Sequence, residues 1–135
     1  MIVGIGIDSV EIKRFEYWHL YSYKSLSRIF QPHEIEYCLS NKKKSPERFA
    51  VRYAAKEAFL KAIYTVNNAQ KPLNLAIICK NVAVSHRPSG MPELTINWQA
   101  LIDSLIIPTA PSTTHLSLTH CATVAIAQVI IEKDQ

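Results

Sequence analysis

The chain has 135 residues, of which 48% are hydrophobic, enough for one domain, residues 1–135, with a single core. Its three cysteines lie far apart and are odd in number, which excludes a closed disulfide framework, and no apolar run is long enough for a membrane helix. We therefore expect reduced thiols and a cytoplasmic location. The net charge of +4 favours an acidic or phosphorylated partner.

The first half of the chain is expected to form one strand and three helices. In order, these are a strand at 2–8, an amphipathic helix at 18–30, a short helix from Pro32 to about Leu39 and a long helix at 48–64. Leu20 and Tyr23 are expected to supply apolar contacts of the first helix. In the short helix, Glu34 falls in the first turn, where a carboxylate faces the positive end of the helix dipole. Residues 40–47 are expected to form an exposed basic loop.

The second half is expected to be mainly β-structure. After a polar break at 67–72, the expected elements are β-rich segments at 75–86 and 92–98 joined by a turn, a short helix at about 99–106, and a hairpin of strands 115–120 and 123–132. Strands and helices do not alternate as they would in a regular βαβ repeat. The sequence therefore predicts an α+β fold.

The first strand combines two glycines with an aspartate. Because alternate side chains of a strand share a face, Gly4, Gly6 and Asp8 point one way while Ile5 and Ile7 point the other. Glycines in a strand let a ligand or another backbone come close, and this cleared face ends in a carboxylate. Two interpretations are open: the glycines admit a packed helix and Asp8 caps the next turn, or Asp8 is a ligand at a binding site.

The long helix carries charges on a circumference that is mostly apolar or small. At 100° per residue, Glu57 and Lys61 share a side with several alanines, so we expect this helix to be flanked on both sides. On an exposed face the two charges would form an i, i+4 pair worth roughly 0.2–0.5 kcal/mol. In a groove of small residues the carboxylate needs a cation instead, and Asp8 is a candidate second ligand for a metal.

Two carboxylates with basic residues nearby favour Mg²⁺, which takes one or two carboxylates together with substrate phosphate oxygens. A phosphate-bearing substrate explains the cations in and beside the long helix, which are Arg48, Arg52, Lys56, Lys61 and Lys42 to Lys44. A run of three lysines is also typical of a solvated loop. His120 ends a predicted strand, where a structural role is the more common one. The sequence has no Walker loop and no G-x-G-x-x-G before a helix.

Two segments resemble the signature segments of the holo-acyl-carrier-protein synthases, the short bacterial-type 4'-phosphopantetheinyl transferases. They are GIGIDSVEIKR at 4–14 and RFAVRYAAKEAFLKA at 48–62, and SGMP at 89–92 and LSLTHCATVAIAQVIIE at 116–132 extend the match. Three positions depart from the family pattern. No glycine follows the long helix within 63–72, Gln31 stands where threonine is usual, and Ser9 replaces an apolar residue.

The resemblance implies a fold and a reaction. The fold is a mostly antiparallel sheet packed on one long helix with shorter helices. The reaction moves the 4'-phosphopantetheine group of coenzyme A to a serine of apo-acyl carrier protein and releases adenosine 3',5'-bisphosphate, in fatty acid biosynthesis. Mg²⁺ is required in the family. Its members are similar in being trimers with sites between subunits, so a homotrimer is expected.

The resemblance also assigns residues. Asp8 and Glu57 would bind Mg²⁺ and act in catalysis together with Lys61, which would stabilise the transferring phosphoryl group. The serine proton would pass to Glu57 or to a metal-bound water. The residues expected to contact coenzyme A are Lys44, Arg52, Lys61, Gly90, Pro92 and His120. Arg14 would meet the acidic carrier protein.

Two other functions would use part of the same residues. A non-catalytic basic domain could bind nucleic acid through residues 42–44, Arg48 and Arg52, with steep salt dependence, but this explains neither Asp8 nor Glu57. A Mg²⁺-dependent phosphatase or pyrophosphatase would share the carboxylates and would hydrolyse coenzyme A without a carrier protein.

Overall fold

The order of helices and strands gives the α+β fold that the sequence predicts. The computed structural model describes residues 1–66, 73–104, 106–111 and 113–134. The strands are β1 (Ile2–Glu11), β2 (Val82–His86), β3 (Pro92–Ile96), β4 (Thr113–His120) and β5 (Val124–Glu132). The helices are η1 (Ile12–Phe15), η2 (Trp18–Leu20), α1 (Tyr23–Leu26), α2 (Pro32–Leu39), α3 (Ser45–Val66), α4 (Leu75–Asn81) and α5 (Trp98–Asp103). The predicted break at 67–72, where the family usually has a glycine turn, lies outside the described residues.

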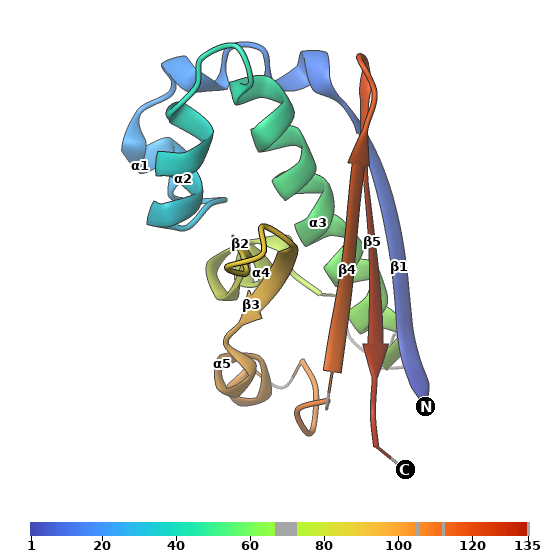
Figure 1. Ribbon diagram of the computed structural model, residues 1–135. Coiled ribbons are helices and arrows are strands. Elements are labelled where there is room, and N and C mark those ends of the chain that lie inside the picture. Colours follow the sequence, from blue (N-terminus) through green and yellow to red (C-terminus); the bar gives the residue numbers. More distant parts are fainter. Residues whose placement is uncertain (67–72, 105, 112, 135) are drawn as a thin grey trace.

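The strands form two antiparallel sheets. The larger has the order β1-β5-β4 and stands along one side of α3, while the smaller, β2-β3, lies on another side of that helix (Figure 1). In the larger sheet Ile130 of β5 lies between Ile5 of β1 and His115 of β4. The predicted hairpin of the last two strands is therefore confirmed. Both ends of the chain lie at the same end of this sheet (Figure 1).

Helix α3 forms the centre of the core. Its fully buried residues are mostly alanines and aromatic or aliphatic residues, including Phe49, Ala50, Ala54, Ala55, Ala58, Phe59, Ala62 and Ile63. Arg52 and Lys56 are buried as well, so the helix is enclosed on both sides, as expected. No helix in the described ranges has both the length and the apolar character needed to cross a membrane.

Gly4 and Gly6 let β1 lie directly against α3. A Cβ at Gly6 would stand 1.9 Å from the carbonyl oxygen of Ala58, and one at Gly4 would stand 2.6 Å from that of Ala62. Neither position has room for a side chain, so close packing of a helix is the correct interpretation of the glycines. Continuing this register, Asp8, the next residue on the same face of β1, approaches the preceding turn of α3.

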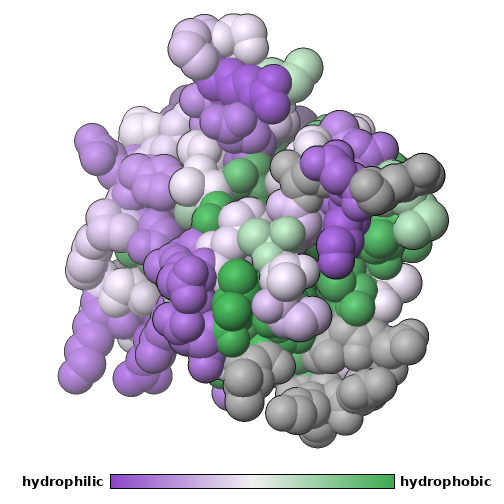
Figure 2. All heavy atoms as spheres, turned by 90° about the horizontal axis from the view of Figure 1, so that it is seen from below, coloured by the Kyte–Doolittle hydropathy of each residue, from purple (hydrophilic) through white to green (hydrophobic). Residues whose placement is uncertain are grey.

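The opposite face of β1 is apolar and exposed. Ile2, Ile5 and Ile7 are 59%, 53% and 57% exposed, and Ile130, which pairs with Ile5, is only half-buried. Hydrophobic residues also gather in the middle of the surface at the end of the molecule where the two termini lie (Figure 2). Exposed apolar surface of this kind typically marks an interaction site.

The segment predicted as one helix at 18–30 consists of shorter pieces, so that prediction was wrong. Ser22 has extended backbone (ψ 152°), and its hydroxyl accepts a hydrogen bond from the backbone N–H of Ser25 at 3.1 Å, which starts α1. Leu20 and Tyr23 are 71% and 58% exposed instead of lying in the core. A serine that bonds to nearby backbone competes with a continuous helix, and here this effect overrides the apolar periodicity.

The segment predicted as β-structure at 75–86 begins instead with helix α4. The side chain of Asn74 accepts from the N–H of Ala76 at 2.8 Å and caps the helix, and only residues 82–86 pair with β3. A short apolar run such as Leu75 to Ile78 does not by itself separate a buried helix from a strand. Asn74 was the available cue. Similarly, α5 ends at Asp103 and not near residue 106.

Candidate active site

The end of β1 meets α3 through an ion pair. Lys61 Nζ donates to Asp8 Oδ1 at 3.0 Å and to the carbonyl oxygen of Ile7 at 2.9 Å. The side chain of Asp8 is 15% exposed and that of Lys61 is 52% exposed. No ion pair between Lys61 and Glu57 is found within the described ranges, so Lys61 serves the strand and not its helical neighbour. Asp8 therefore faces α3 and does not cap the turn that follows it.

Glu57 lies one turn before Lys61 on α3 and is half-buried. Because Gly6 packs against Ala58, Asp8 falls beside the turn of α3 that holds Glu57. We call Asp8, Glu57 and Lys61 the carboxylate edge. No group of three or more His, Cys, Asp and Glu suited to a metal occurs in the part of the chain that the structure describes. Two carboxylates fit Mg²⁺, which completes its shell with water and phosphate oxygens, and do not fit structural zinc.

Arg14 is held beside the carboxylate edge by Tyr53. Its Nη2 atom donates to the phenolic oxygen of Tyr53 at 3.3 Å, and its guanidinium carbon lies 4.7 Å from the centroid of the same ring. Burial raises the pKa of Tyr53, with further contributions from Arg14, which lowers it, and from Glu57, which raises it. Tyr53 thus lies between the predicted carrier-protein contact and a predicted catalytic carboxylate.

A second group of predicted residues lines one cavity of about 180 Å³, which we call the basic cavity. Its walls come from α2, α3, both sheets and the loop before α3, and they include Lys44, Arg48, Arg52, His86, Pro92 and His120. Four of the six residues predicted to contact coenzyme A are in this set. Gly90 is not among the lining residues and has a φ of +87° in the turn before β3. Lys61 belongs to the carboxylate edge.

The back wall of the basic cavity is a stack of cations on Tyr37. The guanidinium carbons of Arg48 and Arg52 lie 4.0 and 4.4 Å from the centroid of this ring, and the His86 ring lies 5.2 Å away. Partial burial, together with Arg52 and Arg48, lowers the pKa of His86. At the rim, His120 Nε2 lies 3.2 Å from Glu47 Oε1.

Arg52 is the most deeply placed cation of this cavity. It is 3% exposed, and its Nε is buried with no hydrogen-bond partner. The one hydrogen bond found for its side chain in the described ranges goes from Nη1 to the carbonyl oxygen of Arg48 at 3.2 Å. A buried guanidinium without a carboxylate partner is costly unless an anion meets it. The cavity is therefore suited to a phosphate group.

Lys56 does not belong to the basic cavity, although its sequence position groups it with the phosphate-binding cations. It is fully buried and pairs with Glu34 Oε1 at 2.7 Å. Glu34 in turn accepts from the backbone N–H of Gln31 at 2.8 Å, and the side chain of Gln31 donates to the carbonyl oxygen of Lys80 at 2.6 Å. The start of α2 is thus fixed by Glu34, although Gln31 stands at its N-cap where threonine is usual in the family.

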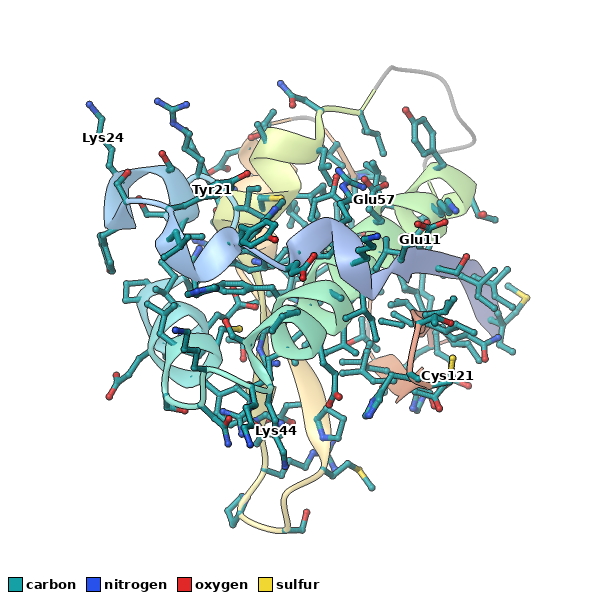
Figure 3. All side chains as sticks on the ribbon, turned by 90° about the horizontal axis from the view of Figure 1, so that it is seen from above. Glu11, Tyr21, Lys24, Lys44, Glu57 and Cys121 are labelled. Carbon is teal, nitrogen blue, oxygen red and sulfur yellow. The ribbon has the colours of Figure 1, made fainter. Side chains whose placement is uncertain are left out.

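The two groups lie on opposite faces of α3. Arg52 and Glu57 are five residues apart, which separates them by about 140° around the helix axis. In Figure 3, Glu57 lies on the side of the helix that faces the N-terminal segment with Tyr21, and Lys44 lies on the other side. Within the described part of the chain, no residue belongs to both the carboxylate edge and the basic cavity.

Sequence reasoning missed three residues of these groups: Tyr37, His86 and Tyr53. Tyr37 and His86 come from elements that no motif connects to α3, so no signal in the sequence marks them. Tyr53 lies four residues before Glu57, a spacing that places both on one helical face, and this could have identified it.

Comparisons with known proteins point to one family. A family model of the 4'-phosphopantetheinyl transferase superfamily matches residues 4–123. A holo-[acyl-carrier-protein] synthase of Treponema denticola is 43% identical over 98% of this chain and 99% of its own, and one of Geobacter sp. strain M21 is 41% identical over 98% and 100%. The structure of a Bacillus anthracis holo-(acyl-carrier-protein) synthase in complex with CoA (3',5'-ADP) superposes with a TM-score of 0.73, at 29% identity and 99% coverage of both chains.

The long helix packed on antiparallel sheets is the fold of solved holo-(acyl-carrier-protein) synthases, which are transferases. The chain belongs to the 4'-phosphopantetheinyl transferase superfamily, and its curated relatives there are holo-[acyl-carrier-protein] synthases. These relatives give no support to the nucleic-acid-binding or pyrophosphatase alternatives.

Proposed function

We propose that this transferase works with Mg²⁺ at the carboxylate edge, binds the nucleotide end of its donor in the basic cavity, and assembles as a homotrimer. Its reaction moves the 4'-phosphopantetheine group of coenzyme A to a serine of apo-acyl carrier protein. The serine oxygen bonds to the phosphorus of the pantetheine phosphate, the bond to the bridging oxygen breaks, and adenosine 3',5'-bisphosphate leaves. One observation supports the split between chemistry and binding: the two charged groups occupy opposite faces of α3.

At the carboxylate edge, Asp8 and Glu57 would hold Mg²⁺, and only Oδ1 of Asp8 is engaged by Lys61. Mg²⁺ bound there would neutralise charge on the diphosphate. Lys61 is half-exposed and reaches outward from the helix, so its ammonium can turn from Asp8 to a phosphoryl oxygen of the substrate. Glu57 would accept the serine proton, since it lies beside the same edge and has no ion-pair partner in the described ranges.

The basic cavity would take the phosphate on the ribose of coenzyme A. Arg52 offers a buried Nε with no partner, and Lys44 and His120 stand at the rim. The Arg52 guanidinium can give two parallel hydrogen bonds to a phosphate, a geometry that favours arginine over lysine at such a site. Gly90 and Pro92 would shape the turn beside it.

The carrier protein would dock around Arg14. Exposed aromatic and apolar side chains follow Arg14 in the chain, Tyr17, Leu20 and Tyr21 among them. A pocket of about 430 Å³ lined by Trp18, Tyr21, Leu26, Ile29 and Tyr53 opens beside Arg14. An acidic partner with an apolar side chain to place in this pocket fits both the charge and the shape.

Assembly through the sheet would complete the site. The exposed isoleucines of β1 form an apolar strip that a second and third copy can cover. One chain holds the carboxylate edge and the basic cavity on opposite faces of α3. A neighbouring chain can therefore place its basic cavity beside the carboxylate edge of the first chain. All three cysteines are free thiols, which agrees with a cytoplasmic location.

The reaction is tested by incubating the chain with an apo-acyl carrier protein, coenzyme A and Mg²⁺ and measuring the intact mass of the carrier. We expect a gain of one phosphopantetheine group that depends on the metal. An unchanged carrier mass, or hydrolysis of coenzyme A without carrier modification, would contradict the proposal.

A further inference from the structure

A fully buried ion pair joins α2 to α3 behind the basic cavity. Lys56 Nζ lies 2.7 Å from Glu34 Oε1, and neither side chain has exposed surface. Glu34 also accepts from the backbone N–H groups of Gln31 at 2.8 Å and Val84 at 3.0 Å, and Lys56 also donates to the carbonyl oxygen of Ile29 at 2.7 Å. Because both groups are cut off from solvent, they cannot touch a substrate and can act only through the elements they hold.

The residues held by this pair are close neighbours, on the same elements, of residues that line the basic cavity. Side chains three or four apart on a helix, or two apart on a strand, share one face. Three such neighbour relations lead from the pair to the cavity wall: Glu34 to Tyr37 on α2, Lys56 to Arg52 on α3 and Val84 to His86 on β2. The three elements that build the back wall are thus fixed at a common point.

We infer that Glu34 and Lys56 are positioning residues for nucleotide binding, because they hold α2 and β2 on α3 so that Tyr37 and His86 stay stacked with Arg52. The inference rests on the proposed function, in which this cavity binds the nucleotide end of coenzyme A. The simpler interpretation is that the Glu34–Lys56 pair only stabilises the fold. However, the desolvation penalty of a buried ion pair offsets much of its Coulomb attraction, whereas its charge-assisted hydrogen bonds fix directions.

Two variants separate positioning from stability. In Glu34→Leu/Lys56→Met, apolar groups of similar volume replace both charges, so no buried charge is left unpaired. The backbone N–H groups of Gln31 and Val84 lose their acceptor, so we expect a lower melting temperature, and binding is measured well below it. At that temperature the Kd of the folded variant for adenosine 3',5'-bisphosphate should rise on the order of tenfold. Glu34→Asp keeps the charge but shortens the side chain by one methylene, so that it cannot reach Lys56 and Val84 together, and a smaller rise, about threefold, is expected. Neither variant changes the net charge of the chain, and Lys80→Met, at an exposed lysine of α4, is the reference for replacing a lysine outside the buried pair.

The measurements are bisphosphate Kd by calorimetry, melting temperature, and the KM values for coenzyme A and for carrier protein. We expect the KM for coenzyme A to rise with Kd and the KM for carrier to change less. Unchanged bisphosphate affinity in the double variant overturns the inference. The inference is also wrong if the affinities for bisphosphate and for carrier protein fall together, in proportion to the fall in melting temperature. If the double variant does not fold, Glu34→Asp decides by the same two criteria. Failure of the unchanged chain to bind the bisphosphate would count against the proposed function instead.

Discussion

The two sides of α3 hold their charges in different ways. At the carboxylate edge Lys61 is half-exposed and rests on Asp8, whereas in the basic cavity Arg52 is buried and stacked on Tyr37, with the Glu34–Lys56 pair behind it. Lys61 must leave Asp8 before it can meet a phosphoryl oxygen, whereas Arg52 is already held in place for a phosphate. In the proposed function this contrast separates a side for chemistry from a side for binding.

The largest effect is expected at the carboxylate edge. Asp8→Asn and Glu57→Gln keep the shape of each side chain and remove its charge, so transfer to the carrier should fall by roughly 10² to 10³ or more. Affinity for adenosine 3',5'-bisphosphate in calorimetry should stay within about twofold, because the basic cavity is untouched. Comparable loss of bisphosphate binding would show that chemistry and binding are not separated.

Arg52→Met should do the reverse. Loss of the buried guanidinium removes charge-assisted hydrogen bonds worth about 1.5–3 kcal/mol, which corresponds to a rise of roughly ten- to a hundredfold in bisphosphate Kd and in the KM for coenzyme A. Lys42→Met, in the exposed loop, is the matched control for a charge outside the lining of the cavity. Equal effects in both variants would mean that the cavity attracts phosphate only through net charge.

Gly6→Ala tests how the carboxylate edge is positioned. The added Cβ meets the carbonyl oxygen of Ala58 at 1.9 Å, so β1 must move away from α3, which we expect to lower the free energy of unfolding by about 1–3 kcal/mol or more. Denaturant titration measures this, with Ser9→Ala, at an exposed residue of the same strand, as the control. A stability loss no larger than that of the control would show that the strand does not lie as close to the helix as described.

Arg14→Glu should affect only the carrier protein. Reversal of this exposed charge should raise the KM for carrier by about tenfold and leave the KM for coenzyme A unchanged. Tyr53→Phe removes the hydroxyl that receives the Arg14 hydrogen bond and keeps the ring, so a smaller rise is expected. If Tyr53→Phe costs the same in an Arg14→Ala background, the hydroxyl does not act through Arg14.

The smallest effect concerns pH. Partial burial, Arg52 and Arg48 lower the pKa of His86, so between that lowered value and the ordinary 6.5 the unfolded chain binds more protons than the folded one. The free energy of unfolding should therefore rise with pH across this window and stop rising above it. In His86→Gln the slope should be shallower. If the free energy of unfolding has the same pH profile in both chains, the Arg48 and Arg52 charges at the wall of the cavity do not act on His86.

Much of the fold followed from local signals. Residues 45–47, expected in the loop at 40–47, form the first turn of the long helix. Two elements were predicted: the long helix, expected at 48–64 and found at 45–66, from a composition rich in Ala, Leu, Lys and Glu, and the last hairpin, from two β-rich segments around a short turn. The segments at 18–30 and 75–81 were not, because single capping residues, Ser22 and Asn74, decide the conformation there and apolar spacing does not reveal them.

The carboxylate edge could be anticipated because Gly4, Gly6 and Asp8 alternate along one strand and Glu57 sits among small residues. Their meeting depends on glycine packing, which the pattern allows but does not require. The wall of the basic cavity could not be predicted, since Tyr37 and His86 reach Arg52 only through tertiary contacts. Lys56 was misassigned for the same reason: its partner Glu34 lies on a different helix.

The central claim is that one site combines the carboxylate edge of one chain with the basic cavity of another. It is tested by mixing Asp8→Ala with Arg52→Ala under conditions that exchange subunits and measuring carrier modification by intact mass. The coenzyme A concentration is kept far below the raised KM of the Arg52 variant, so that each variant alone has little activity. If the site is shared between chains, a random equal mixture regains about a quarter of the activity, because one pairing in four brings two intact groups together. If each chain holds a complete site, the mixture stays as inactive as its components, and the account is contradicted.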